Sequence, residues 1–168
     1  MILPELNQLA LPQLKEALAT CCGSTAWVNE LAKIFPVESK ESLFEQAETI
    51  WFACSESDWR EAFRHHPKIG DIHSLREKFA GTKAWAAGEQ SGVSVASQQV
   101  LEDLSEGNRL YEEKFGYIFI VCATGKSADE MLDLLNARLL NSPETEILIA
   151  MQEQNKITKI RLEKLLTL

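Results

Sequence analysis

The stretch Phe115-Gly116-Tyr117-Ile118-Phe119-Ile120-Val121-Cys122-Ala123 decides the fold class of this chain. It is rich in β-branched and aromatic residues and carries no charge, so propensity alone predicts a buried strand. A lone strand has no partner for its hydrogen bonds, however, and no second segment of the chain resembles this one. We therefore expect an extended or irregular buried segment among helices, with backbone amides left to bind a ligand.

Apolar residues recur at helical spacing on both sides of this segment. After it, a helix capped by Ser127 is expected to end at Asn141, and Ser142-Pro143 begins the longest helix, which runs to about Leu166. Before Ser127, helices are expected over residues 11–22, 74–79 and 97–114. Three more are expected to start at the caps Ser24, Ser42 (with Glu45 as a capping box) and Ser57. The prediction is an all-α fold, a single compact bundle of seven or eight helices with one buried extended segment, as one domain over residues 1–168.

Composition and short motifs indicate which binding partners and which cellular compartment to expect. The net charge of -8 argues against nucleic acid and anionic membrane, because phosphate binding needs concentrated Lys and Arg. The four cysteines form no Cys-x-x-Cys pair, a pattern that fits a reduced cytoplasm. The sequence begins without a secretory signal, contains no apolar run long enough to span a bilayer, and ends without a peroxisomal address.

Two of the three histidines lie in the stretch His65-His66-Pro67-Lys68-Ile69-Gly70-Asp71. Pro67 disfavours the helical conformation of the residue before it, so the preceding helix is expected to end at the histidines. A rigidly held imidazole at a helix exit suits general acid or base chemistry, because its pKa lies near neutrality. The alternative is a histidine that merely caps the last carbonyls of its helix.

Arg161 and Gln154 fall on the apolar stripe of the longest helix, among Ile147, Met151, Ile157, Leu162 and Leu165. A guanidinium in that position could point into a pocket and hold a carboxylate or ureido oxygen. It could equally reach out to solvent or pair with a buried acid. Glu89-Gln90 is a second polar pair of interest, for which surface exposure is the default explanation.

A metal site is a weaker hypothesis. His66, Asp71 and His73 could bind an ion, but two imidazoles without a third firm ligand are a poor match to known metal sites.

Taken in order, these residues resemble the 2-oxo-4-hydroxy-4-carboxy-5-ureidoimidazoline (OHCU) decarboxylase family over about residues 10–166. The motifs that carry the resemblance are His66-Pro67-x-x-Gly70, Glu89-Gln90-x-Gly92, Asn108-x-x-Tyr111-x-x-x-Phe115-Gly116-Tyr117-x-Phe119, Gly125-Lys126-Ser127, Arg138, Asn141 and Arg161-Leu162. Each motif is common alone, and the ordered set is specific.

The resemblance implies a cofactor-free enzyme, usually a homodimer, that decarboxylates a ureidoimidazoline to (S)-allantoin in the last step from urate to allantoin. It places the catalytic residues at His66, Glu89 and Arg161, with no metal ligand. The substrate pocket is implied to be lined by Pro67, Ala86, Gln90, Phe119, Ile120, Val121, Cys122 and Ala123.

The chain departs from the family pattern at two places. Ala86 stands where many members have a serine, and Lys68-Ile69 follow the His-Pro pair where an acidic residue and leucine are common. These departures put in doubt any contact of the Ala86 side chain with substrate. The alternative class is a non-catalytic helical interaction domain, which predicts no closed pocket and no effect of small ureides on thermal stability.

Overall fold

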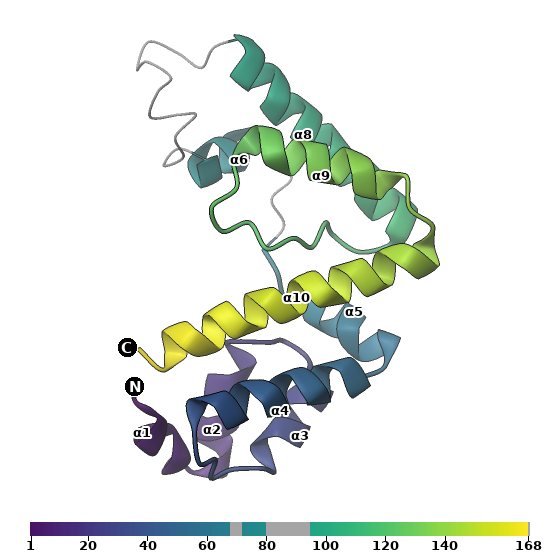
Figure 1. Cartoon of the computed structure of the whole chain (residues 1–168). Coiled ribbons are helices and arrows are strands. Elements are labelled where there is room, and N and C mark those ends of the chain that lie inside the picture. Colours follow the sequence, from purple (N-terminus) through teal and green to yellow (C-terminus); the bar gives the residue numbers. More distant parts are fainter. Residues whose placement is uncertain (68–71, 80–94, 168) are drawn as a thin grey trace. The chain divides into compact units, whose positions relative to one another are not determined.

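The structure is a computed structural model that describes residues 1–67, 72–79 and 95–167. These residues form helices and no strand, which confirms the all-α class. The helices are α1 (Leu3–Asn7), α2 (Leu11–Ala19), α3 (Thr25–Ala32), α4 (Lys40–Ala53), α5 (Glu56–Arg64), α6 (Ile72–Phe79), α8 (Val95–Phe115), α9 (Ala128–Leu139) and α10 (Pro143–Leu165) (Figure 1). The described part alone exceeds the expected seven or eight helices because the short α1 was not anticipated.

The chain divides into two compact units. Unit 1 comprises residues 1–66 and 150–168, and unit 2 comprises residues 67–149, so that the division falls within α10. A single domain over residues 1–168 stays a prediction. None of the helices described is long and apolar enough to cross a membrane.

Three tryptophans hold the core of unit 1 together. The indole N–H of Trp27 on α3 donates to the carbonyl of Ala47 on α4 at 2.9 Å, and that of Trp51 on α4 donates to Met151 on α10 at 2.8 Å. Trp59 on α5 donates to the Trp51 carbonyl at 3.0 Å. Each ring therefore buries apolar surface while its polar atom stays satisfied, and the three bonds connect four helices.

Two of the expected helix starts were wrong. α4 begins after Ser39, whose hydroxyl accepts from the Ser42 amide at 3.1 Å, so Ser42 lies inside the first turn. α5 begins after Ser55, which forms a capping box with Asp58, and Ser57 is again inside the helix. In both cases an earlier serine provides the cap. The caps at Ser24 and Ser127 are confirmed, with amide-to-hydroxyl distances of 3.3 Å and 3.2 Å.

In unit 2, α8 packs against α9 and α6. A β-carbon at Gly107 of α8 would lie 2.6 Å from Leu135 of α9, so the missing side chain lets the two helices approach closely. α8 ends at Phe115, and Gly116 follows with φ of 79°, a left-handed conformation that glycine adopts without strain. The segment after this turn has no regular structure as far as residue 123, which confirms the expected irregular course.

Candidate active site

His66 lies immediately beyond α5, as the sequence predicts. His65 is the C-cap of the helix, and the His66 amide donates to the Phe63 carbonyl at 3.3 Å. The His65 ring rests on Gly23, where an added β-carbon would lie 2.5 Å from the ring. The capping box at the start of α5 and this packing at its end fix the point from which the half-buried His66 side chain projects.

The imidazole of His66 is held by a buried amide. Its Nε2 is hydrogen-bonded to Oε1 of Gln154 on α10, and Gln154 Nε2 donates to the Thr158 hydroxyl at 3.2 Å. Gln154 is fully buried and Thr158 is 3% exposed. Because Gln154 Nε2 donates to Thr158, its oxygen accepts from His66, which places the proton of a neutral ring on Nε2.

Arg161 lies on the same face of α10. Gln154, Thr158 and Arg161 are spaced at i, i+4 and i+7, which brings their side chains onto one side of the helix. Arg161 is half-buried, and its guanidinium makes no hydrogen bond or ion pair within the part of the chain that the structure describes. Pairing with a buried acid, one of the two structural explanations for Arg161, therefore has no support among these residues.

Two buried thiols lie close enough to Arg161 for its charge to lower their pKa. Burial raises the pKa of Cys22 to about 11, and this outweighs the hydrogen bonds from the Ser24 backbone and Thr158 and the charge of Arg161, which all lower it. Burial also raises the pKa of Cys21, against the opposing effects of Thr20 and Arg161. Both thiols are therefore neutral near pH 7 and contribute no negative charge to balance Arg161.

The segment of residues 119–123 in unit 2 offers backbone donors. The carbonyls of Ile120, Cys122 and Ala123 accept hydrogen bonds from Arg138, Lys126 Nζ and the Lys126 amide, respectively. The amides of residues 119–123 donate to no atom of the described chain. This is the arrangement expected from the sequence, and such amides suit the oxygen atoms of a planar, polar ligand.

The remaining expected site residues are placed only in part. Pro67 is described and exposed, whereas Ala86, Glu89 and Gln90 lie outside the described residues. Among the residues of the hypothetical metal site, Asp71 also lies outside the described residues. His73 is exposed, and its Nε2 lies 3.2 Å from Oε1 of Glu77. No group of three potential metal-binding side chains occurs within the described ranges.

Sequence reasoning missed the function of Gln154 and Thr158 as supports of His66. The available signal was an amide within the apolar stripe of α10, because a buried amide needs partners. It also did not predict that Arg138, to which the sequence assigned no role, pairs with Glu146.

Known proteins resemble the chain in both structure and sequence. A crystal structure of (S)-allantoin synthase superimposes with a TM-score of 0.73 at 19% identity, covering 98% of this chain and 54% of that one, and shows the fold alone. A crystal structure of OHCU decarboxylase in the presence of (S)-allantoin superimposes with a TM-score of 0.72 at 36% identity, covering 91% of this chain and 98% of that one.

Among curated proteins, the uric acid degradation bifunctional protein TTL of Arabidopsis thaliana is 38% identical over 146 residues, which are 86% of this chain and 45% of that protein. The chain thus spans less than half the length of this relative. The family model described as OHCU decarboxylase matches residues 7–163. The chain therefore belongs to the OHCU decarboxylase family.

Proposed function

We propose that this chain decarboxylates 2-oxo-4-hydroxy-4-carboxy-5-ureidoimidazoline to (S)-allantoin without a cofactor, in the last step of urate degradation to allantoin. The observation that carries the proposal is the polar face of α10 in unit 1. There Gln154 holds the imidazole of His66, and Arg161 presents a guanidinium without a partner among the described residues. A proton-transfer group and an anion-binding group are the two protein functions that this reaction needs most.

The chemistry explains why these groups suffice. As the bond between the ring carbon and the carboxylate breaks, CO2 leaves and its bonding electron pair remains on the ring. The adjacent imine of the imidazoline can accept that pair, so the electron sink lies in the substrate. The protein then has to hold the breaking bond across the ring plane, stabilise the growing negative charge and deliver one proton to a single face.

Each proposed residue takes one of these tasks. His66 delivers or relays the proton, because imidazole both loses and regains a proton near neutral pH. Arg161 binds substrate oxygens and favours the developing negative charge. Glu89, assigned from the family resemblance, orients the imidazole or holds the hydroxyl or a ureido N–H of the substrate. The amides of residues 119–123 bind the edge of the planar ring.

Further parts of the proposal rest on the resemblance. Pro67, Ala86 and Gln90 complete the substrate pocket, Ala86 through its backbone. The protein acts as a cytoplasmic homodimer built from single-domain subunits, without binding nucleic acid or membrane.

The decisive experiment is circular dichroism of freshly generated OHCU with and without the protein. OHCU decomposes unaided, and the uncatalysed product is a mixture of enantiomers. We expect the protein to accelerate the decay and to give one enantiomer of allantoin. A rate and a product mixture equal to the blank would refute the proposed activity.

Two controls separate this proposal from its alternatives. Allantoin resembles the product and should raise the melting temperature by mass action, whereas a non-catalytic interaction domain predicts no shift. Activity should be indifferent to a chelator. Loss of activity on chelation, with recovery on adding a divalent ion, would favour a metal-dependent site at His66, Asp71 and His73.

A further inference from the structure

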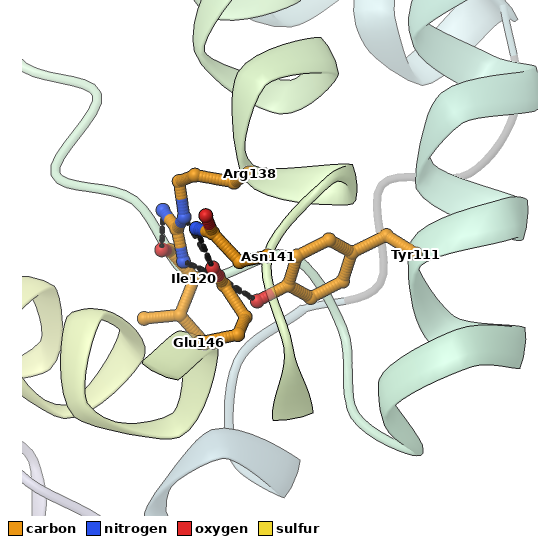
Figure 2. A network of polar contacts seen from close by, with 5 residues as sticks. All are labelled: Tyr111, Ile120, Arg138, Asn141 and Glu146. Carbon is orange, nitrogen blue, oxygen red and sulfur yellow. Dashed lines mark hydrogen bonds and ion pairs between the residues drawn. The ribbon is translucent and has the colours of Figure 1, made fainter. Parts of the chain in front are cut away.

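Several residues that carry the family resemblance have no task in the proposed reaction, and three of them meet in unit 2. The side chains of Tyr111 on α8, Arg138 on α9 and Asn141 converge on Glu146 in the first turns of α10 (Figure 2). Glu146 is fully buried and Arg138 is 6% exposed. Burying a pair of charges costs folding free energy unless hydrogen bonds compensate for the lost water. The partners of this pair therefore need to be accounted for.

The hydrogen bonds of this network are complete. Glu146 Oε1 accepts from the Tyr111 hydroxyl and from Arg138 Nε, the latter at 2.7 Å, and its Oε2 accepts from Asn141 at 3.0 Å. Arg138 Nη2 donates to the Tyr111 oxygen at 3.3 Å. Burial and the bond to Glu146 raise the pKa of Tyr111 against the charge of Arg138, which keeps the phenol a donor. The guanidinium is thus fixed in one orientation.

The remaining nitrogen of Arg138 contacts the segment that is proposed to bind substrate. Nη1 donates to the Ile120 carbonyl at 2.6 Å, and the guanidinium carbon lies 4.6 Å from the centroid of the Phe119 ring. The Tyr111 ring packs edge-on against Phe119 at 5.1 Å. The network therefore contacts the segment at two consecutive residues, Phe119 and Ile120.

We propose that Arg138, locked in place by Glu146, is a positioning residue that holds the backbone of residues 119–123 with its amides aimed at the substrate. This inference rests on the proposed function and adds to it a determinant of substrate binding outside the pocket. A peptide whose amides make no bonds within the described chain has no regular structure to hold it, so the bonds to its carbonyls fix its orientation. Those from Lys126 are local, whereas the bond from Arg138 to Ile120 connects the segment to α9. Arginine suits this task because its planar fork can bind a carboxylate and a carbonyl at once.

Arg138→Lys tests this proposal. A lysine keeps the positive charge beside Glu146 but cannot reproduce the fork that also reaches Ile120. We expect KM to rise about tenfold, which corresponds to the loss of roughly one hydrogen bond to the substrate. The change in kcat should be much smaller, because contacts with the ring edge stabilise the bound substrate and the transition state alike. The ¹⁵N order parameters of the backbone of residues 119–123 should fall in the same variant, because the segment loses its anchor.

Tyr111→Phe is the matched control. It deletes a hydroxyl bonded to both Glu146 and Arg138 but keeps the ring against Phe119 and the bond from Arg138 to Ile120. It should lower the melting temperature, and it should change KM and the order parameters of the segment much less than Arg138→Lys does, because the bond from Arg138 to Ile120 remains. Arg138→Lys with wild-type order parameters for residues 119–123, or with wild-type KM in an active enzyme, would overturn the positioning role. If the wild-type protein lacked decarboxylase activity, the proposed function would fail, and the order parameters would still decide the structural part.

Discussion

Arg138 and Arg161 look alike in sequence and differ in structure. Each lies on the apolar stripe of its helix, but Arg138 has a buried carboxylate and two further oxygens as partners, whereas Arg161 has no partner in the described chain. The charge of Arg138 is balanced by Glu146, and the thiols beside Arg161 stay neutral. A guanidinium with a partner at each nitrogen shapes the protein, and one without a partner in the described chain can bind a ligand.

The largest effect on stability is expected at Arg138. Arg138→Met leaves Glu146 buried without its counter-charge, which should reduce the free energy of unfolding by about 3–5 kcal/mol. Chemical denaturation measures this loss. Arg109 of α8 provides the matched control, because it pairs with Glu106 and Glu113 on the surface at 2.7 and 2.8 Å. Arg109→Met should cost far less, because solvent screens an exposed ion pair, and equal losses at the two sites would contradict the distinction between the two arginines.

The opposite pattern is expected at Arg161. Arg161→Met removes a preorganised donor from a developing anion, which should lower turnover by roughly two or more powers of ten, or about 3 kcal/mol. Stability should be unchanged or higher, because an apolar chain of similar length fits beside Leu162. Steady-state turnover and thermal melting of the same preparation give both values. Wild-type turnover in Arg161→Met would remove Arg161 from the site.

Gln154 should affect activity without acting on the substrate itself. Gln154→Leu keeps the size of the side chain but abolishes the bond to His66, so we expect roughly tenfold lower turnover in a stably folded protein. Gln154→Glu places a carboxylate against the imidazole, which favours the imidazolium and should move the pH–rate profile to higher pH. Unchanged profiles in both variants would show that the bond between Gln154 and His66 has no effect on the reaction.

The smallest expected effect concerns the thiol beside Arg161. The folded pKa of Cys22 is raised from 9.0 to about 11, so the folded state holds the proton more tightly than the unfolded state. The resulting stability is fully present below pH 9 and is lost as the pH rises from 9 to 11, by about 1.4 kcal/mol at pH 10. Urea denaturation at pH 8 and pH 10 should therefore reveal a smaller loss in Cys22→Ala than in wild type. Equal losses in the two proteins would contradict the burial argument.

Local signals in the sequence predicted most helix boundaries. Pro67 and Pro143 fixed the end of α5 and the start of α10, because proline restricts the backbone in any tertiary context. Cap positions were less certain where serines cluster. Ser39 and Ser42 both precede apolar residues of α4, and the choice between them depends on where the previous loop delivers the chain.

The candidate site was predictable as a set of residue types but not as a set of contacts. The sequence identified His66, Gln154 and Arg161 as polar groups in unusual places, yet the bond from His66 to Gln154 joins residues 88 positions apart. The same applies to Arg138, whose partner Glu146 lies on the next helix. Helical periodicity reports which face a residue occupies and contains no information on what the neighbouring helix places opposite it.

The most direct test of this account compares Arg161→Lys with Arg138→Lys in the chiral allantoin assay. Both changes keep a positive charge and remove a planar fork, so they differ only in what the fork contacts. We predict that Arg161→Lys loses most of kcat, whereas Arg138→Lys raises KM and retains most of kcat. The same kinetic parameter changing to the same extent in both variants would contradict the assignment of one arginine to the substrate and the other to the fold.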